Sequence, residues 1–241
     1  MKYLVNLKYD GKFFYGWGIQ PTVKTVQGEV ENSLKTILGK KTRIVVGGRT
    51  DRYVHAKDQY FTFESNSKKV DSKLKKALNN NLTGIKIIKI TKVDPNFILS
   101  DSIQQKTYLY KVKVGQNTSF NDYHHTVVKK LDHKKMKKAS KWLIGTLDFA
   151  SFTIKKENYG TTIRTVNNIK IRHFGKTTHI SFTGEGFMRF QVRNLAGALL
   201  AHNRGNLTDI ELKELISLPE KGKCHWKAPG SGLYLQSTQL K

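Results

Sequence analysis

The chain has 241 residues, and its 43 lysines and arginines against 18 aspartates and glutamates give a formal net charge of +25. Its hydrophobic content of 38% argues against disorder, and no apolar run approaches the roughly 18 residues of a membrane span. The single cysteine, Cys224, excludes an intramolecular disulfide and a cysteine-based zinc site. The opening residues 1–10 alternate in character and do not form a secretory signal, so we expect a cytoplasmic protein.

The excess of positive charge indicates a polyanionic partner. Nucleic acid is the main candidate, because neutralised phosphates release their counterions. The alternative is a lysine-rich surface that only keeps the protein soluble. Lysine supplies most of the charge, so the arginines, which can bind phosphate with two N–H groups at once, are the more informative positions.

The first half of the chain is predicted to contain strands and two helices. Apolar residues at helical spacing from Val26 to Leu38, between an N-cap candidate at Thr25 and a terminating Gly39, predict the first helix. A glycine- and aromatic-rich loop over residues 10–17 precedes this helix. The expected strands cover residues 3–7, 43–46, 60–63 and 85–90, and a short second helix lies near residues 74–78.

The second half is predicted to open with an alternating strand over residues 107–114, in which Tyr108 lies on the apolar face. A basic helix is expected from an N-cap at Asp132 through Trp142, and residues 208–211 (Thr-Asp-Ile-Glu) have the sequence of a capping box. The remaining expected elements are strands over residues 166–172 and 178–183, a helix from about 187 to 202, and a closing apolar segment over 233–235.

These elements mix strands and helices without a strict βαβ alternation, which favours an α+β fold with antiparallel sheet over a doubly wound fold. Both halves contain several strands and two helices, and no linker rich in proline, glycine or serine separates them. We therefore expect two similar α+β subdomains, residues 1–103 and 104–241, that share one mainly antiparallel sheet.

Familiar cofactor motifs fail in this sequence. Residues 184–186 (Gly-Glu-Gly) open like a dinucleotide-binding loop, but position 189 is arginine where a third glycine is required. The histidines are scattered and no HExxH or clustered ligand set occurs, so we expect no metal. No G-x-S-x-G elbow occurs, although Ser-His-Asp catalysis stays open on the sequence alone. The default expectation is chemistry without a cofactor.

The segment over residues 47–56 (GGRTDRYVHA) has the composition of a catalytic loop. Its paired glycines allow a close backbone approach, and Asp51 stands between Arg49 and Arg52 in the sequence. Cationic neighbours lower the pKa of an aspartate and keep it ionised, as a nucleophile or base beside a polyanion requires. The alternative is an ordinary salt bridge in a surface loop, which would contribute little.

This segment resembles the catalytic motif of the tRNA pseudouridine synthase family typified by bacterial pseudouridine synthase A. The family pattern reads roughly G-R-T-D-A-G-V-H-A, followed by a glutamine and an aromatic residue that Gln59 and Phe63 match here. The resemblance covers nearly the whole chain and includes five further segments in the family's order. These are Tyr9-Asp10-Gly11, Thr107-Tyr108-Leu109-Tyr110, Asp148-Phe149, Val192-Arg193-Asn194 and Gly232-Leu233-Tyr234-Leu235.

The resemblance implies a pseudouridine synthase fold with an active-site cleft between the two subdomains, and it implies roles for individual residues. Asp51 is the catalytic aspartate of the N-terminal subdomain, Tyr108 the tyrosine that stacks on uracil, and Arg193 the arginine that pairs with the aspartate. Substrate-binding positions are expected at Arg49, Arg52, Phe187 and Leu233, with further phosphate contacts from the lysines between Lys134 and Lys141.

The implied reaction converts a uridine of the tRNA anticodon stem-loop, at position 38, 39 and/or 40, into pseudouridine without cofactor or metal. Direct attack of the aspartate on C1′ and a route through a glycal both remain open. A homodimer with tRNA as its partner is expected, with no membrane and no DNA. The alternatives are a non-catalytic RNA-binding or chaperone protein on the same scaffold, or a synthase with shifted uridine targets.

The sequence departs from the family pattern at several positions. Arg52 and Tyr53 replace the small Ala-Gly pair that follows the catalytic aspartate, and Asp58 stands where the motif usually has glycine. Residues 97–100 (Phe-Ile-Leu-Ser) lack the arginine that the family has before its Y-x-Y strand. These changes bear on the choice of uridine and on how the RNA is held.

Overall fold

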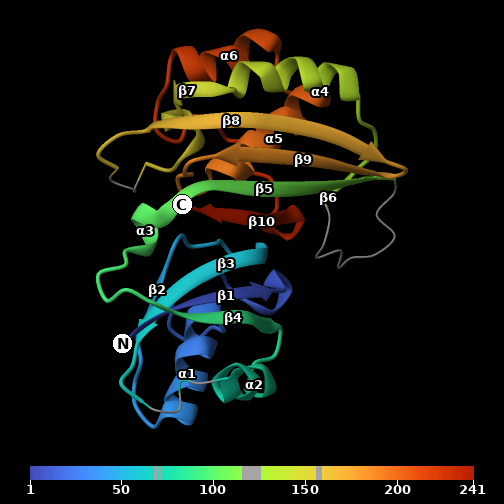
Figure 1. Ribbon diagram of the computed structural model, residues 1–241. Coiled ribbons are helices and arrows are strands. Elements are labelled where there is room, and N and C mark those ends of the chain that lie inside the picture. Colours follow the sequence, from blue (N-terminus) through green and yellow to red (C-terminus); the bar gives the residue numbers. More distant parts are fainter. Residues whose placement is uncertain (68–69, 71, 116–125, 156–158) are drawn as a thin grey trace. The chain divides into compact units, whose positions relative to one another are not determined.

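The computed structural model describes residues 1–67, 70, 72–115, 126–155 and 159–241 (Figure 1). The chain divides into two compact units, one formed by residues 1–104 together with 234–241 and the other by residues 105–233. Our division after residue 103 places the C-terminal segment in the second subdomain, whereas the structure places residues 234–241 in the first unit.

The first unit is an antiparallel sheet with one parallel addition. The antiparallel strands follow the order β4-β1-β3, and β2 pairs with β3 as well. The last strand, β10, joins β3 in parallel, with Tyr234 opposite His55 and Leu235 opposite Ala56. The elements are β1 (Lys2–Tyr9), α1 (Val26–Leu38), β2 (Ile44–Val46), β3 (His55–Glu64), α2 (Ser72–Asn81), β4 (Ile85–Val93), α3 (Leu99–Ser102) and β10 (Leu233–Leu240).

Helix α1 has the bounds and the ends that its sequence predicts. The Thr25 side chain accepts a hydrogen bond from the Gly28 amide at 3.3 Å, and Gly39 ends the helix with a left-handed φ of 76°. The helix buries one carboxylate, that of Glu31, which accepts from the Gln27 side chain at 2.8 Å and from the Ile44 amide at 3.2 Å. Glu31 therefore ties α1 to β2 without leaving a buried charge unpartnered.

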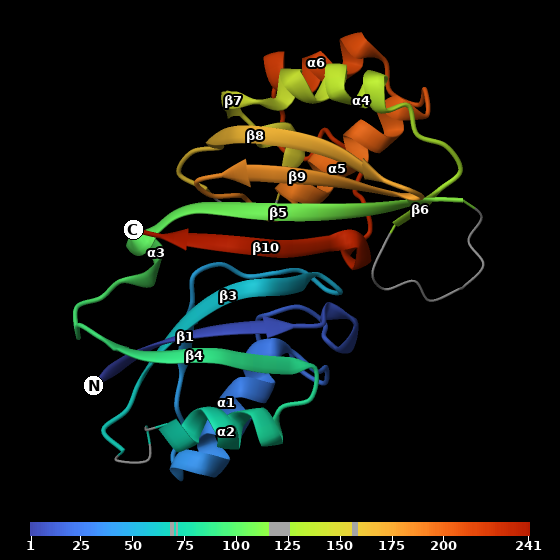
Figure 2. The ribbon, with the colours of Figure 1, turned by 45° about the vertical axis from the view of Figure 1, so that its right-hand side comes forward.

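The second unit carries a four-stranded antiparallel sheet in the order β5-β9-β8-β7, and the short β6 pairs in parallel with β5. Helix α5 contacts both α4 and α6, and α4 also contacts β8 (Figures 1 and 2). The elements are β5 (Ile103–Val114), β6 (Thr126–Val128), α4 (His133–Ser140), β7 (Gly145–Asp148), β8 (Ile163–Phe174), β9 (Thr177–Gly184), α5 (Gln191–Asn203) and α6 (Asp209–Ser217). Mainly antiparallel strands with helices in both units confirm the α+β class.

Helix α5 begins later than the sequence predicts. The expected start lies near Phe187, but the first helical residue is Gln191, because Phe190 adopts a left-handed φ of 64°. Almost the whole of α5 is buried, and its Gly197 lies against the backbone of the segment over residues 226–228. A Cβ at Gly197 would stand 1.9 Å from the Trp226 carbonyl oxygen, so the close approach depends on glycine.

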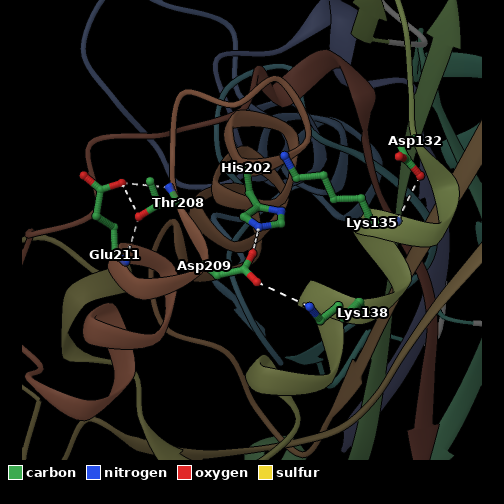
Figure 3. Close-up of polar contacts among 7 residues, drawn as sticks. All are labelled: Asp132, Lys135, Lys138, His202, Thr208, Asp209 and Glu211. Atoms are coloured by element: carbon green, nitrogen blue, oxygen red, sulfur yellow. Dashed lines mark hydrogen bonds and ion pairs between the residues drawn. The ribbon is translucent and has the colours of Figure 1, made fainter.

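The capping box of α6 is present as predicted (Figure 3). The Thr208 hydroxyl accepts from the Glu211 amide at 3.2 Å, and the Glu211 carboxylate accepts from the Thr208 amide at 2.7 Å. The bond from the Thr208 amide, and a second one that the Thr208 hydroxyl donates to the same carboxylate at 2.8 Å, lower the pKa of the Glu211 carboxyl. Asp132 caps α4 in the same way, by accepting from the Lys135 amide at 2.9 Å.

A polar contact joins three helices of the second unit. His202 of α5 lies with Nε2 2.6 Å from the Asp209 carboxylate, at the first turn of α6 (Figure 3). The other Asp209 oxygen lies 3.5 Å from the Lys138 ammonium group of α4. The hydrogen bond from His202 is the main cause of a lowered pKa at Asp209. No helix in the described part of the chain has the length and apolar character to cross a bilayer.

Candidate active-site elements

Asp51 lies half-buried on the loop between β2 and β3, and its predecessor Thr50 anchors that loop. The Thr50 carbonyl accepts from the Trp17 amide at 3.0 Å. The Thr50 hydroxyl lies 2.7 Å from the Tyr9 hydroxyl, and burial raises the pKa of the Tyr9 phenol, which keeps it neutral. The backbone that carries Asp51 is therefore held by hydrogen bonds to neighbouring elements.

Two glycines of the preceding loop make room for this backbone. A Cβ at Gly16, whose φ is 98°, would stand 2.9 Å from the Thr50 carbonyl oxygen. A Cβ at Gly11 would stand 2.4 Å from the Val54 carbonyl oxygen, which is closer than any side chain tolerates. The glycine- and aromatic-rich loop thus serves as a support against which the Asp51 loop packs.

Two motif residues that follow Asp51, His55 and Gln59, hold this unit together. Gln59 is buried, and its amide donates to the Gly48 carbonyl at 2.9 Å across the base of the loop. His55 is 2% exposed and stacks on Tyr234 with ring centroids 4.4 Å apart. Nδ1 of His55 accepts from the Gly11 amide at 3.0 Å. The Asp10 carboxylate lies equally close to Nδ1, at 3.0 Å, and accepts a hydrogen bond from it whenever Nδ1 carries the ring hydrogen.

The departure at Asp58 also has a structural explanation. Its carboxylate accepts from the Asn6 side chain of β1 at 2.6 Å and from the Thr238 amide of β10 at 2.8 Å. The Thr238 hydroxyl in turn donates to the Asp58 carbonyl at 2.9 Å. Asp58 therefore links β1, β3 and β10. These hydrogen bonds give its carboxylate a structural role at a position where the family motif usually has glycine.

Arg52 and Tyr53 place two large side chains next to Asp51, where the family pattern has the small Ala-Gly pair. Asp51 to Val54 form a turn closed by the Val54 amide on the Asp51 carbonyl at 3.1 Å, and Tyr53 has a left-handed φ of 65° in it. The glycine of the family motif would adopt this φ freely, whereas a residue with a Cβ costs about 1–2 kcal/mol. The Arg52 guanidinium lies over the rings of Tyr15 and Tyr53, 4.0 Å and 4.3 Å from their centroids.

In the second unit, β5 holds Tyr108 against Phe187. Tyr108 is 9% exposed, and its ring meets that of Phe187 edge to face, with centroids 5.4 Å apart and planes at 89°. Phe187 has room because position 184 is glycine; a Cβ at Gly184 would stand 3.1 Å from the ring and 2.5 Å from the Thr165 carbonyl oxygen. Two of the predicted site residues, far apart in sequence, are thus brought together.

Arg193 lies in the first turn of α5. It is held by residues 226–228, the segment whose backbone packs against Gly197. Its Nε donates to the Ala228 carbonyl at 2.9 Å, and its own carbonyl accepts from the Ala228 amide at 3.0 Å. The guanidinium also lies 5.3 Å from the centre of the Phe190 ring. These contacts set the plane of the Arg193 guanidinium.

The remaining predicted residues occupy varied environments. Arg49 is exposed on the same loop as Asp51, and Leu233 is buried at the start of β10. Of the lysines proposed for phosphate contact, Lys134, Lys137 and Lys141 are exposed, while Lys138 is engaged with Asp209. The described residues contain no group of three or more His, Cys, Asp or Glu side chains that could hold a metal ion.

Sequence reasoning missed two supporting aromatic residues. The ring of Tyr15 contacts Arg52, and the ring of Phe190 contacts Arg193. Neither aromatic residue was among the predicted site residues. The available signal for Tyr15 was an aromatic residue within a glycine-rich loop. For Phe190, no local pattern indicates a left-handed backbone.

The sequence was compared with known proteins. A profile of the tRNA pseudouridine synthase family matches residues 139–239. The chain is 38% identical to tRNA pseudouridine synthase A of Malacoplasma penetrans, with 99% of each chain covered, and 33% identical to that of Ureaplasma parvum, with 98% covered. It is 32% identical to tRNA pseudouridine synthase A 2 of Bacillus anthracis, again over 99% of each chain.

Among solved structures, the chain resembles the archaeal box H/ACA sRNP Nop10-Cbf5 complex, with a TM-score of 0.38 and 15% identity over 79% of this chain and 43% of that chain. The full-length sequence identity to the curated relatives decides the classification. This identity makes the chain a pseudouridine synthase, which is an enzyme of the isomerase class. The chain belongs to the tRNA pseudouridine synthase A family.

Proposed function

We propose that the protein converts uridine to pseudouridine in the anticodon stem-loop of tRNA, at position 38, 39 and/or 40. The observation that carries this proposal is the retained Asp51 on a fixed loop, whose backbone is anchored before Asp51 by Tyr9, Trp17 and Gln59 and after it by the hydrogen bond from the Tyr53 amide to the Phe14 carbonyl. Relatives of the same length that bear the name tRNA pseudouridine synthase A support tRNA as the substrate.

In the proposed reaction, Asp51 attacks or deprotonates the ribose of the target uridine, and the N1–C1′ glycosidic bond breaks. The uracil rotates and C5 forms a new bond to C1′, while the bond from Asp51 to C1′ breaks or, on the glycal route, the proton that Asp51 took from the ribose is returned. C5 then loses its proton and N1, freed from C1′, takes one up. The reaction is an isomerisation, so no atom is gained or lost overall. The anchored loop supports this role because a nucleophile or base must be held in position to act efficiently.

Tyr108 stacks on the extruded uracil in this proposal, and Phe187 restrains its ring. A base must leave its stack before the chemistry, at a cost of a few kcal/mol, and an aromatic platform recovers roughly 1–3 kcal/mol. The edge-to-face contact at 5.4 Å limits the orientations open to Tyr108, so less freedom is lost when the base arrives. Leu233 provides an apolar wall beside the base.

Arg193 is proposed to pair with Asp51 and to keep it ionised and oriented. A guanidinium presents its N–H donors in a rigid planar fork that suits a carboxylate. The hydrogen bond from Nε to the Ala228 carbonyl at 2.9 Å fixes the direction of that fork before substrate binds. Loss of Arg193 should therefore reduce the rate more than the stability of the fold.

The net charge of +25 supports binding of an RNA larger than the reacting nucleotide. We propose that Arg49, Arg52 and the exposed lysines of α4 contact phosphates, and that two copies of the chain form a homodimer in the cytoplasm that holds one tRNA across both. Arg52 and Tyr53 favour, as a second candidate, a synthase of the same chemistry whose target uridines are shifted, because these large residues stand directly beside Asp51.

The test is release of tritium from unmodified tRNA that carries 5-tritiated uridine, because C5 loses its hydrogen in the reaction. We expect release by the wild-type protein and at least a thousandfold slower release by Asp51→Asn, since the catalytic carboxylate is removed. Asp101→Asn, an exposed aspartate of the same unit, is the matched control and should keep the wild-type rate.

Mapping of the product by carbodiimide adducts and primer extension then identifies the modified positions. Stops outside positions 38–40 would support the synthase with shifted targets. No tritium release from any tRNA would refute the enzymatic proposal, and release that survives Asp51→Asn would refute the assignment of the catalytic residue.

A further inference from the structure

A cation–aromatic cluster stands directly beside Asp51, and two of its three residues replace the small Ala-Gly pair of the family pattern. It consists of Tyr15, Arg52 and Tyr53, which we call the tyrosine–arginine cluster. The Arg52 guanidinium carbon lies 4.0 Å from the ring centre of Tyr15 and 4.3 Å from that of Tyr53, and the two rings are 6.3 Å apart at 50°. Arg52 also donates a hydrogen bond to the Tyr53 hydroxyl. One guanidinium thus contacts two tyrosine rings at once.

The backbone fixes the cluster relative to Asp51. The Tyr53 amide donates to the Phe14 carbonyl at 3.3 Å, and the Tyr15 amide donates to the Lys24 carbonyl at 2.8 Å. Gly16, which follows Tyr15, is packed against the Thr50 carbonyl. The two loops that supply the cluster are therefore the same two loops that position Asp51, and the arginine is attached at the next residue.

The cluster presents an oriented arginine side chain at the protein surface. Arg52 is exposed and Tyr15 is 40% exposed, so the cluster faces solvent although its parts are ordered. The two ring contacts and the hydrogen bond to the Tyr53 hydroxyl restrict the orientation of the guanidinium, while its exposed side can offer the remaining N–H groups to a ligand. An arginine edge in a planar, oriented state matches the oxygens of a phosphate, and stacking reduces the freedom that binding would otherwise remove.

The backbone conformation of Tyr53 also indicates a binding role for the cluster. Its left-handed φ of 65° is one that glycine adopts without strain, yet a tyrosine is kept there and its ring covers Arg52. Strained backbone persists where surrounding structure enforces it, and such residues gather at binding and active sites. A side chain that served no purpose at this position would be disfavoured by its own backbone.

We propose that the tyrosine–arginine cluster is a preorganised binding site for one backbone phosphate of the RNA substrate, at the nucleotide next to the target uridine. This inference rests on the proposed function, because it takes the RNA beside Asp51 as its ligand. Arg52 binds the phosphate, and Tyr15 and Tyr53 position Arg52. A purely structural role, in which the cluster only joins the two loops, is the competing explanation and predicts a loss of stability without loss of affinity.

The experiment measures binding of an unmodified anticodon stem-loop RNA by fluorescence anisotropy, in an Asp51→Asn background so that no turnover occurs. Arg52→Ala should weaken binding about tenfold at 100 mM salt, and the slope of log K against log salt should fall by roughly 0.7–0.9, as expected for one lost phosphate contact. Arg43→Ala, an exposed arginine of the same unit outside the cluster, is the matched control and should change binding less than twofold.

Two further variants separate preorganisation from charge alone. Arg52→Lys should keep the salt slope but weaken binding about threefold, because an ammonium group lacks the planar fork. Tyr15→Leu should weaken binding by a similar factor, and combined with Arg52→Ala it should add nothing further, because the tyrosine acts through the arginine. Thermal melting of each variant shows whether the fold is retained.

Binding by Arg52→Ala that equals binding by Arg43→Ala would overturn the phosphate site, and wild-type affinity of Arg52→Lys would overturn its preorganisation. The proposed activity is tested separately by tritium release. Release by the wild-type protein with unchanged binding by Arg52→Ala refutes only the phosphate site. Binding that depends on Arg52 without any release refutes only the proposed reaction.

Discussion

Replacement of Gly197 by alanine tests the packing on which the Arg193 contacts depend. The added methyl group would stand 1.9 Å from the Trp226 carbonyl oxygen and 2.9 Å from the Ala228 nitrogen, both backbone atoms that cannot rotate away. Either α5 or the segment over residues 226–228 must move. Overpacking of this kind costs about 1–3 kcal/mol, which offsets the helix propensity that alanine would otherwise add.

The clash with rigid backbone puts the cost at about 2–3 kcal/mol, of which the helix propensity of alanine returns about 1 kcal/mol. For a protein of this size each kcal/mol lowers Tm by about 2–4 °C, so we expect Gly197→Ala to melt about 2–8 °C below the wild type by circular dichroism. Gly160→Ala is the matched control, because a Cβ there meets no atom within 4 Å, and its Tm should stay within about 1 °C. Tritium release should slow as well, since Ala228 holds Arg193 through two hydrogen bonds. An unchanged Tm for Gly197→Ala would refute the close approach of α5 to residues 226–228.

Two further predictions concern the second unit. Thr208→Ala removes one side of the α6 capping box and should lower the free energy of unfolding by about 1 kcal/mol in urea titrations; Thr36→Ala, within α1, is the control and should cost less. Burial raises the pKa of the Cys224 thiol to about 11, so at pH 8 only about 0.1% is thiolate and a thiol reagent should label it at least a hundredfold more slowly than in urea. Equal labelling rates in the folded and unfolded protein would contradict the buried environment of this thiol.

Elements whose signals are local were predictable from the sequence. The cap at Thr25, the glycine stop at Gly39 and the capping box of Thr208 and Glu211 each depend on residues within one or two helical turns. The alternation that places Tyr108 on the buried face of β5 is of the same kind. For these elements, short-range hydrogen bonds and side-chain periodicity are sufficient causes.

Elements determined by distant contacts were not predictable in this way. The start of α5 is delayed because Phe190 takes a left-handed backbone, and no cap residue indicates this. The short strand β7 (Gly145–Asp148) is defined by its pairing with β8 and not by its composition. The assignment of β10 to the first unit depends on its parallel pairing with β3, a contact between segments almost 180 residues apart.

The candidate site shows the same division. The motif around Asp51 was visible in the sequence, but the supporting roles of Gln59 and Asp58 require the folded contacts to be seen. The stacking of Arg52 on Tyr15 joins residues 37 positions apart (52 − 15) and has no local signature. The catalytic roles of Asp51, Tyr108 and Arg193 stay predictions until the rates of the variants are measured.

The return of β10 to the first unit has a consequence for synthesis. Tyr234 stacks on His55, and Thr238 donates to Asp58, so the sheet beside the Asp51 loop is completed by residues made last. A ribosome adding about 5–20 residues per second needs roughly 6–26 s to translate residues 105–233. During that interval the start of β3, at His55 and Ala56, lacks the strand that pairs with it in parallel, and an unpaired strand edge is the kind of surface on which nascent chains associate wrongly. The loop that carries Asp51 emerges early, yet it reaches its finished surroundings only near the end of translation.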